Sequence, residues 1–237
     1  VNLAVGEFGK SPGVFNKDYA YPGAKQFDYC QAKGMKVIRL PFKWERVQDE
    51  LMGPLDPADM AQIDAVVKLA RDRDLKLILD MHNYARYNGK VIGTEDVPNA
   101  AYGDVWQKLA SHYREEKAIF AYGIMNEPHA TKGLWPAAAQ ACVDAIRKVD
   151  TTHTILACGD GWSGAHSWPG INGTFLLKDP TGNVVYEAHQ YFDHNNSGSY
   201  KKSYDDEGAY PTVGADRLQP FIKWLKEHNV RGFIGEF

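Results

Sequence analysis

Apolar residues follow two alternating patterns along the chain. Short, nearly continuous apolar runs are typical of strands that are buried on both faces of a sheet. Seven such runs predict strands at residues 1–5, 35–42, 75–82, 118–127, 153–158, 183–191 and 231–236. Between them, apolar residues recur every three or four positions, which predicts helices at residues 55–74, 102–113, 136–150 and 217–229.

Two of the predicted helices contain residues that indicate where they start or bend. Asp56 stands at the N-cap position of the first helix, and Pro57 stands at its first helical position, where a missing N–H group costs nothing. In the last helix, Pro220 is expected to open or kink the helix, because proline cannot donate the backbone hydrogen bond of a helix interior.

The alternation of strands and helices predicts parallel β/α units. The 237 residues contain no shift in composition and no internal repeat, so we expect a single α/β domain spanning residues 1–237. Seven units fit a (β/α)8 TIM barrel of which seven of the eight strands are present. The chain ends one residue after Glu236, so we expect the eighth strand to be absent and the barrel to be incomplete at its C-terminal end.

Composition excludes several classes of protein. A formal net charge of -3, with 44% hydrophobic and 24% charged residues, is ordinary for a globular protein and does not favour nucleic acid as a partner. No apolar run reaches the roughly 18 residues that a membrane span needs. The three cysteines, Cys30, Cys142 and Cys158, match no zinc spacing and are expected to be small buried residues.

Polar residues gather at the C-terminal ends of five predicted strands. They are Arg39, Asp80, His82, Asn83, Asn126, Glu127, His189, Tyr191 and Glu236. A single polar residue at a strand end usually caps a loop or a helix. In a β/α barrel, however, these ends meet on one face, where the active site lies. The recurrence on five strands therefore indicates a site.

Two of these residues, Glu127 and Glu236, are carboxylates that each end an apolar run. Two carboxylates in one pocket can take different catalytic roles when their surroundings give them different pKa values. One remains protonated and gives its proton to a leaving oxygen, while the other remains ionised and attacks. An arginine beside the second would keep it ionised. This arrangement cleaves glycosidic bonds.

Five motifs, in this order along the chain, resemble glycoside hydrolase family 5, the retaining cellulase family: VIRLPF, DMHNY, IMNEPHA, EAHQYFD and FIGEF. The segments GEFG and GWSGAHSW look closest to the secreted fungal-type endo-β-1,4-glucanases of that family. The resemblance extends nearly from end to end. It implies a retaining, endo-acting hydrolase of β-1,4-glucan that works by double displacement as a secreted monomer and needs no cofactor.

The resemblance also implies roles for single residues. Glu127 looks like the acid/base and Glu236 like the nucleophile, with Arg39 as the arginine that supports it. Asn126 is similar to the amide that contacts the 2-hydroxyl of the sugar being cleaved. His82 and Asn83 match the family's pair on the third strand, of which the histidine lines the sugar site, and His189 and Tyr191 match the pair around the two glutamates. Strand alternation places Glu187 on the same face as His189 and Tyr191, although no catalytic role is assigned to it.

Aromatic residues in the loops after the strands suggest how a polysaccharide would be held. Trp162, Trp168, Tyr84 and Tyr87 have rings that can stack on pyranose rings, and each has the alternative of packing its loop against the barrel. The loops decide the choice of polysaccharide within the family, so a β-mannanase or another β-glucanase remains an alternative. A further alternative is that the chain is a truncated, non-catalytic fragment.

Other catalytic classes find less support in the sequence. A metal hydrolase would need a motif such as H-E-x-x-H or a histidine pair with zinc spacing, and neither occurs, so no metal is expected. A Schiff-base barrel would need a lysine at a strand end, whereas Lys36 and Lys76 stand at strand starts.

Overall fold

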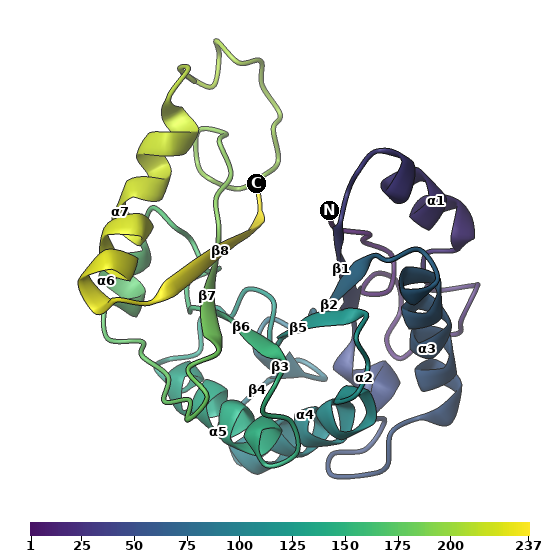
Figure 1. Cartoon of the computed structure of the whole chain (residues 1–237). Coiled ribbons are helices and arrows are strands. Elements are labelled where there is room, and N and C mark those ends of the chain that lie inside the picture. Colours follow the sequence, from purple (N-terminus) through teal and green to yellow (C-terminus); the bar gives the residue numbers. More distant parts are fainter.

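Six parallel strands form one strongly curved sheet, and helices lie along its outer side (Figure 1). The computed structural model describes all 237 residues. The sheet order β1-β2-β5-β6-β7-β8 follows the order of the strands along the chain. The strands are β1 (Val37–Phe42), β2 (Lys76–Met81), β5 (Ile119–Gly123), β6 (Thr154–Cys158), β7 (Val184–His189) and β8 (Arg231–Glu236). The predicted parallel β/α arrangement is confirmed.

Seven helices and a small hairpin connect these strands. The helices are α1 (Ala24–Ala32), α2 (Trp44–Val47), α3 (Pro57–Arg71), α4 (Asn99–Tyr113), α5 (Trp135–Arg147), α6 (Trp168–Asn172) and α7 (Val213–His228). The hairpin pairs β3 (Arg86–Tyr87) with β4 (Lys90–Val91). The four predicted helices correspond to α3, α4, α5 and α7, whereas α1, α2, α6 and the hairpin were not predicted. No helix is both long enough and apolar enough to span a membrane.

The start of α3 agrees with the prediction from the sequence, whereas the start of α7 does not. The Asp56 side chain accepts a hydrogen bond from the Asp59 N–H at 2.7 Å, so the predicted N-cap of α3 is confirmed. Helix α7 starts at Val213 and continues through Pro220, so the expectation that Pro220 opens the helix is wrong. The buried side chains of Phe221 and Trp224 pack against the core directly after the proline and hold this part of the helix in place.

The predicted strand at residues 1–5 is reduced to a single bridge between Asn2 and Arg39, so the count of seven strands is wrong. The Arg39 N–H donates to the carbonyl of Val1 at 2.8 Å, and the Leu3 N–H donates to the carbonyl of Arg39 at 3.1 Å. The chain then turns away over residues 4–7, which leaves Val5 exposed. The Asn2 side chain reaches the other edge of the sheet, where it donates to the carbonyl of Gly235 at 3.2 Å.

The interior of the curved sheet contains two layers of side chains, as expected for a barrel core. The lower layer is apolar and consists of Val37, Ile78, Ala121, Leu156, Val185 and Phe233. Two residues further along each strand, the upper layer consists of Arg39, Asp80, Gly123, Cys158, Glu187 and Gly235. Because side chains alternate along a strand, both layers point inward. The change from apolar to charged residues therefore marks where the core ends and the polar face begins.

The larger core fills the space between the sheet and its helices. Among its buried aromatic residues are Trp44, Trp106, Trp135, Trp168 and Trp224. All three cysteines are buried, as predicted, and all three are free.

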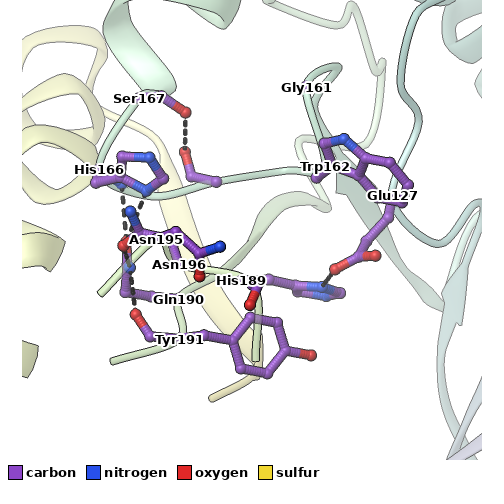
Figure 2. Close-up of a pocket in the computed structure, with 12 residues that line it drawn as sticks. Glu127, Gly161, Trp162, His166, Ser167, His189, Gln190, Tyr191, Asn195 and Asn196 are labelled. Carbon is purple, nitrogen blue, oxygen red and sulfur yellow. Dashed lines mark hydrogen bonds and ion pairs between the residues drawn. The ribbon is translucent and has the colours of Figure 1, made fainter. Parts of the chain in front are cut away.

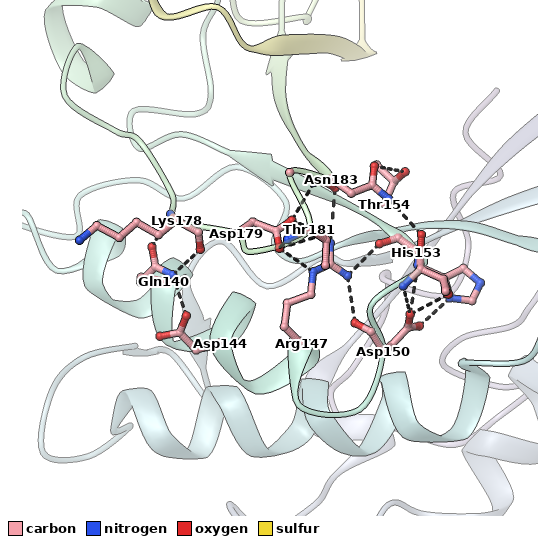
Figure 3. Close-up of polar contacts among 12 residues, drawn as sticks. Gln140, Asp144, Arg147, Asp150, His153, Thr154, Lys178, Asp179, Thr181 and Asn183 are labelled. Carbon is pink, nitrogen blue, oxygen red and sulfur yellow. Dashed lines mark hydrogen bonds and ion pairs between the residues drawn. The ribbon is translucent and has the colours of Figure 1, made fainter.

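A buried ion pair lies near the N-terminal ends of β6 and β7, at the end of the sheet opposite the polar face (Figure 3). Arg147, in the last turn of α5, contacts both carboxylate oxygens of Asp179 at 2.9 and 3.1 Å. Its remaining guanidinium nitrogen donates to the carbonyls of Asp150 and His153 at 3.1 and 2.9 Å. The two ionic side chains are only 4% and 3% exposed. The pair therefore joins α5 to the segments that lead into β6 and β7.

Removal of Asp179 is expected to leave the Arg147 guanidinium buried without a counterion. Asp179→Asn should lower the free energy of unfolding by about 3–5 kcal/mol at pH 7, as measured by urea denaturation. Asp144→Asn, at an exposed position of α5, is the control and should cost less than about 0.5 kcal/mol.

The effect of Asp179→Asn should depend on pH. Burial would raise the pKa of Asp179, but hydrogen bonds from Arg147 and Thr181 lower it below its usual value. The ionised carboxylate therefore stabilises the fold above its unfolded pKa of about 3.9 and loses this contribution as the pH falls through the lower folded value. An equal loss of stability for both variants at pH 7, or a loss that grows on acidification, would contradict this role.

Candidate active site

One buried guanidinium, that of Arg39, contacts carboxylates from three other strands. Its nitrogens lie 3.0 Å from Asp80 Oδ1, 3.2 Å from Glu187 Oε1 and 2.7 Å from Glu236 Oε1. Burial lowers the pKa of Arg39, but the charges of Asp80, Glu187 and Glu236 outweigh it and raise the pKa. Arg39 thus remains charged and connects β1 with β2, β7 and β8.

The residues around Arg39 form a closed ring of polar contacts. The Arg39 guanidinium donates to Asn126 Oδ1 at 2.7 Å, and the Asn126 amide lies 3.1 Å from His82 Nε2. The other ring nitrogen of His82 lies 2.8 Å from Asp80, which pairs with Arg39 in turn. Because Asn126 donates to Nε2, the proton of His82 is on Nδ1, where it faces Asp80. Each member of the ring fixes the orientation of the next.

The two glutamates of the predicted site meet at His189. Its Nδ1 lies 2.8 Å from Glu127 Oε1 and 3.8 Å from Glu236 Oε2. Together the three residues present ligand atoms that all lie within 4.8 Å of one another. Glu236 also accepts a short hydrogen bond from the Tyr191 hydroxyl. The sequence-predicted residues Arg39, Asn126, Glu127, His189, Tyr191 and Glu236 are therefore brought together.

The surroundings give Glu236 and His189 opposite pKa shifts. Burial would raise the pKa of Glu236, but the charges of His189 and Arg39 and the Tyr191 hydrogen bond lower it. Burial would lower the pKa of His189, but its hydrogen bonds with Cys158, Glu127 and Glu187 raise it well above the usual value. Both ring nitrogens of His189 face carboxylates, at 2.8 and 3.2 Å, so both donate. Glu236 is consequently ionised next to a protonated imidazole.

Backbone geometry at the site departs from the usual range for residues other than glycine. Glu127 has φ 43°, Tyr84 φ 53° and Trp162 φ 61°. Such left-handed conformations cost of order 1–3 kcal/mol each and persist only where the surroundings hold them. Here β5 already ends at Gly123, and the Asn126 N–H then donates to the carbonyl of Met81 at 2.8 Å. The left-handed turn at Glu127 then follows directly.

Trp162 is a fixed aromatic surface above Glu127 (Figure 2). One face of its ring stacks on His129, with centroids 3.5 Å apart and planes inclined by 7°. The Tyr84 ring approaches both rings edge-on, at 5.9 and 5.7 Å. Because Trp162 is still 53% exposed, it can stack on a ligand.

A pocket of about 500 Å³ opens beside Glu127 and Trp162 (Figure 2). Its other walls come from the loops after β6 and β7 and are mostly polar. They are formed by Gly161, Gly164, His166, Ser167, His189, Gln190, Tyr191, Asn195, Asn196 and Ser197. Gln190 links the two loops, because its side-chain oxygen accepts from the His166 N–H at 3.0 Å and its amide donates to Asn196 at 2.9 Å. Glu236 does not line this pocket, so the pocket lies on the Glu127 side of the site.

Three residues from the sequence analysis lie away from the ligand-facing surface. Asn83 accepts from the Trp44 N–H at 2.8 Å and donates to Glu45 at 2.7 Å, so it holds the segment after β1. Trp168 is fully buried and packs against Phe221 and Trp224 of α7. Tyr87 is 6% exposed and packs on Trp44. Of the four candidate stacking residues, only Tyr84 and Trp162 remain.

Comparison with known proteins identifies the family. The model of the cellulase family, glycosyl hydrolase family 5, matches residues 5–237. The chain belongs to glycoside hydrolase family 5. Endo-β-1,4-glucanase B of Aspergillus niger is 32% identical over 240 residues, which cover 100% of this chain and 70% of that protein.

Solved structures of family 5 enzymes share the fold of this chain. Pseudomonas stutzeri endoglucanase Cel5A is 44% identical with a TM-score of 0.96, and the match covers 99% of this chain and 74% of that one. The endo-β-1,4-glucanase Xac0029 of Xanthomonas axonopodis pv. citri is 39% identical with a TM-score of 0.94 and coverages of 100% and 76%. The resemblance read from the five motifs is confirmed.

Two residues of this family 5 site, Asp80 and Glu187, were noted in the sequence but were given no role in the site. Asp80 pairs with both Arg39 and His82, and Glu187 pairs with Arg39 and His189. The signal was present in both cases, since each stands two positions before a selected histidine and so shares its face of the strand.

Two groups of side chains around His189 have metal-ligand spacing. They are Cys158 with Glu187 and His189, and Glu127 with His189 and Glu236. Both groups need His189 as a ligand. His189 already contacts Glu187 and Glu127 through its two ring nitrogens, at 3.2 and 2.8 Å.

Arg39→Met is expected to leave the facing carboxylates without their cation. The free energy of unfolding at pH 7 should fall by about 3–5 kcal/mol, as measured by urea denaturation, and the pKa of Glu236 should rise. The loss should shrink below about pH 4, where carboxylates take up protons. Arg71→Met, which removes an exposed pair with Glu116, is the control and should cost less than about 1 kcal/mol. Equal losses for the two variants would refute a special role for Arg39.

Proposed function

We propose that this chain is the catalytic domain of a retaining endo-β-1,4-glucanase in which Glu127 is the acid/base and Glu236 the nucleophile. The observation that carries the assignment is the convergence of both carboxylates on His189, with oxygens within 4.8 Å of each other. Retaining glycosidases hold the two carboxyl groups about 5–5.5 Å apart, whereas inverting enzymes need about 6.5–9.5 Å to admit a water molecule. The short separation supports direct attack by a carboxylate.

In the first step, ionised Glu236 attacks the anomeric carbon and forms a glycosyl ester, while Glu127 gives its proton to the departing oxygen. Arg39 and Tyr191 each hold one oxygen of Glu236. In the second step, Glu127 takes a proton from water, and the water attacks the same carbon and releases Glu236. Glu127 Oε1 accepts from His189, which leaves Oε2 for the proton that is exchanged.

The supporting residues have distinct places in this scheme. Asn126 is proposed to contact the 2-hydroxyl of the cleaved sugar, with its orientation set by Arg39 and His82. His82 is proposed to line the same sugar position, and Asn83 to support the adjoining loop from behind. Trp162 is proposed to stack on the sugar that leaves with the proton of Glu127, because it stands above the pocket on that side.

The choice of β-1,4-glucan rests on the relatives. The curated relative from Aspergillus niger is an endo-β-1,4-glucanase, Pseudomonas stutzeri Cel5A has been solved with cellobiose, and XacCel5A has been solved with cellopentaose. An exposed tryptophan beside a polar pocket suits glucan chains, whose rings have apolar faces and hydroxyl rims.

Further properties follow from this assignment. We propose that residues 1–237 act as one domain and as a monomer outside the cell, where an insoluble polymer must be degraded. The two carboxylates supply the acid, base and nucleophile, so the proposed chemistry requires no cofactor.

Substrate choice is tested directly by the release of reducing sugar from carboxymethyl cellulose, with mannan as the comparison. Release from carboxymethyl cellulose alone, with the β-anomer as the first product by proton NMR, is the expected result. Faster release from mannan would reassign the substrate, and an α-anomeric first product would exclude a retaining mechanism.

Variants of the two glutamates should separate their roles. Glu236→Gln should lower kcat/KM about 10,000-fold or more on every substrate, because no nucleophile remains. Glu127→Gln should slow cellotetraose cleavage by about 100- to 10,000-fold, but formation of the glycosyl ester from a dinitrophenyl cellobioside much less, because that leaving group needs no proton. Glu115→Gln, at an exposed position, is the control. Equal effects of Glu127→Gln on both substrates would contradict its role as acid.

Loss of the Trp162 ring should affect only substrates that reach the pocket. Trp162→Ala is expected to raise KM for cellotetraose about 3- to 10-fold and to leave aryl cellobioside hydrolysis nearly unchanged. Tyr29→Ala removes an exposed ring far from this face and should change neither. An equal change for both substrates would show that Trp162 acts on the catalytic residues instead of the leaving sugar.

A further inference from the structure

The Tyr191 ring needs support from outside the sheet. Strand β7 ends at His189, two residues earlier, so strand geometry does not fix the direction of this ring. Arg217 of α7 holds only the backbone here, by donating to the carbonyls of Tyr191 and Asp193 at 2.8 Å each. Yet the Tyr191 hydroxyl must meet one oxygen of Glu236. Another part of the chain must therefore hold the ring.

Residues 198–200 supply that support. Gly198 has φ +72°, and a Cβ at this position would lie 2.8, 2.9 and 3.0 Å from three carbons of the Tyr191 ring. The backbone of Gly198 thus packs directly on the ring, and no larger residue fits between them. The Tyr200 ring meets the Tyr191 ring edge-on at 6.3 Å, and its hydroxyl accepts from the Phe192 N–H at 3.1 Å.

The conformation of this loop depends on one carboxylate, that of Asp193, which is 2% exposed. Asp193 Oδ1 accepts from the Gly198 N–H at 3.1 Å. Its Oδ2 accepts from the Ser197 hydroxyl at 2.7 Å and from the Ser199 N–H at 3.1 Å. The carboxylate thus binds the residue that touches Tyr191 and both of its neighbours.

We propose that Asp193 is a positioning residue for the nucleophile: it folds residues 193–200 so that Gly198 packs on the Tyr191 ring and keeps its hydroxyl on Glu236. The geometric part stands independently of the enzyme's activity. Its catalytic consequence rests on the proposed function of Glu236.

The same loop also lines the pocket. Asn195, Asn196 and Ser197 line the pocket beside Glu127, together with Tyr191 (Figure 2). A leaving sugar in this pocket would touch the loop that supports the nucleophile. Asp193 thus connects the sugar-binding wall with Glu236.

The effect on Glu236 follows from the groups that face it. They are His189 of β7, Arg39 of β1, His82 directly after β2, Tyr191, and Glu127, whose carboxylate lies within 4.8 Å. Loss of Asp193 leaves the three cationic or imidazole groups in place and removes only the Tyr191 hydrogen bond. The pKa of Glu236 should then rise by about half to one unit, the equivalent of one such hydrogen bond.

The first measurement is the pKa of Glu236 by carbon-13 NMR of protein labelled at the glutamate side-chain carboxyls, with the signal assigned by Glu236→Gln. Asp193→Ala, Gly198→Ala and Tyr191→Phe should each raise it by about half to one unit. The double variant Asp193→Ala/Tyr191→Phe should show no more than Tyr191→Phe alone, because both remove the same contact. Asp206→Ala is the control: it loses only a hydrogen bond from the Ser203 hydroxyl, in the same segment between β7 and α7, and should leave the pKa of Glu236 unchanged.

The second measurement is the pH profile of kcat/KM with an aryl β-cellobioside. The acidic limb should move upward by the same amount in the Asp193 and Gly198 variants, with a loss of about 3- to 10-fold on that limb. A purely structural role would lower activity at all pH values and leave the limb in place.

Three outcomes would overturn the proposal: an unchanged pKa of Glu236 in folded Asp193→Ala, additive shifts in the double variant, or an equal shift in Asp206→Ala. If Asp193→Ala does not fold, Gly198→Ala decides, since it keeps the Asp193 carboxylate and places a methyl group against the Tyr191 ring, at a backbone φ of +72° that alanine adopts only with strain. If the wild-type chain does not hydrolyse the cellobioside, the proposed function fails, and the NMR titration still decides the role of Asp193.

Discussion

The arrangement of the whole site depends on how one buried guanidinium is shared among carboxylates. Arg39 stands on β1, at one edge of the curved sheet, and Glu236 ends β8, at the other edge. Their 2.7 Å contact crosses the interior and joins two strands that share no ladder of backbone hydrogen bonds. Buried ion pairs are tolerated only where good geometry and further hydrogen bonds offset desolvation. Arg39 has hydrogen bonds to Glu236 and Asn126, and the carboxylates of Asp80 and Glu187 lie close to it as further ionic partners.

The same charges make two chemically identical side chains different. Glu236 lies between Arg39 and His189, both cationic, and receives a hydrogen bond from Tyr191. Glu127 has His189 as its only ionic partner and faces the polar pocket. Glu236 therefore receives more cationic contacts than Glu127, although the two side chains are chemically the same. The buried pair of Arg147 and Asp179 lies at the other end of the strands. It joins segments of the chain and does not affect the difference between the two glutamates.

Much of the fold was predictable, because the apolar patterns of strands β2 and β7 and of helix α3 are enough to identify these elements. The segment at residues 1–5 has the same apolar pattern, but the chain turns after Leu3, and no property of those five residues announces the turn. Trp168 was ambiguous for a similar reason. The sequence of a loop does not show whether its tryptophan stacks on a sugar or, as here, packs against α7.

The site was largely predictable because its residues end strands whose ends must meet, and because the five motifs resemble a known family. The backbone conformations at Glu127 and Trp162 were not, since left-handed geometry at a residue other than glycine depends on tertiary contacts. The contacts of Gly198 with Tyr191 could not be predicted from the sequence either. They depend on a turn that the side-chain hydrogen bonds of Asp193 define, and such bonds leave no periodic pattern of apolar residues.

Gly235, directly before Glu236, limits how this end of β8 can diversify. A methyl group there would lie 1.9 Å from Glu187 Oε1 and 2.9 Å from His189 Nε2, in a layer already filled by charged side chains. Position 235 is thus closed to gradual change, since even the smallest enlargement displaces the ions around Glu236. Mutagenesis libraries intended to change substrate choice should therefore keep this glycine and vary the loops that line the pocket.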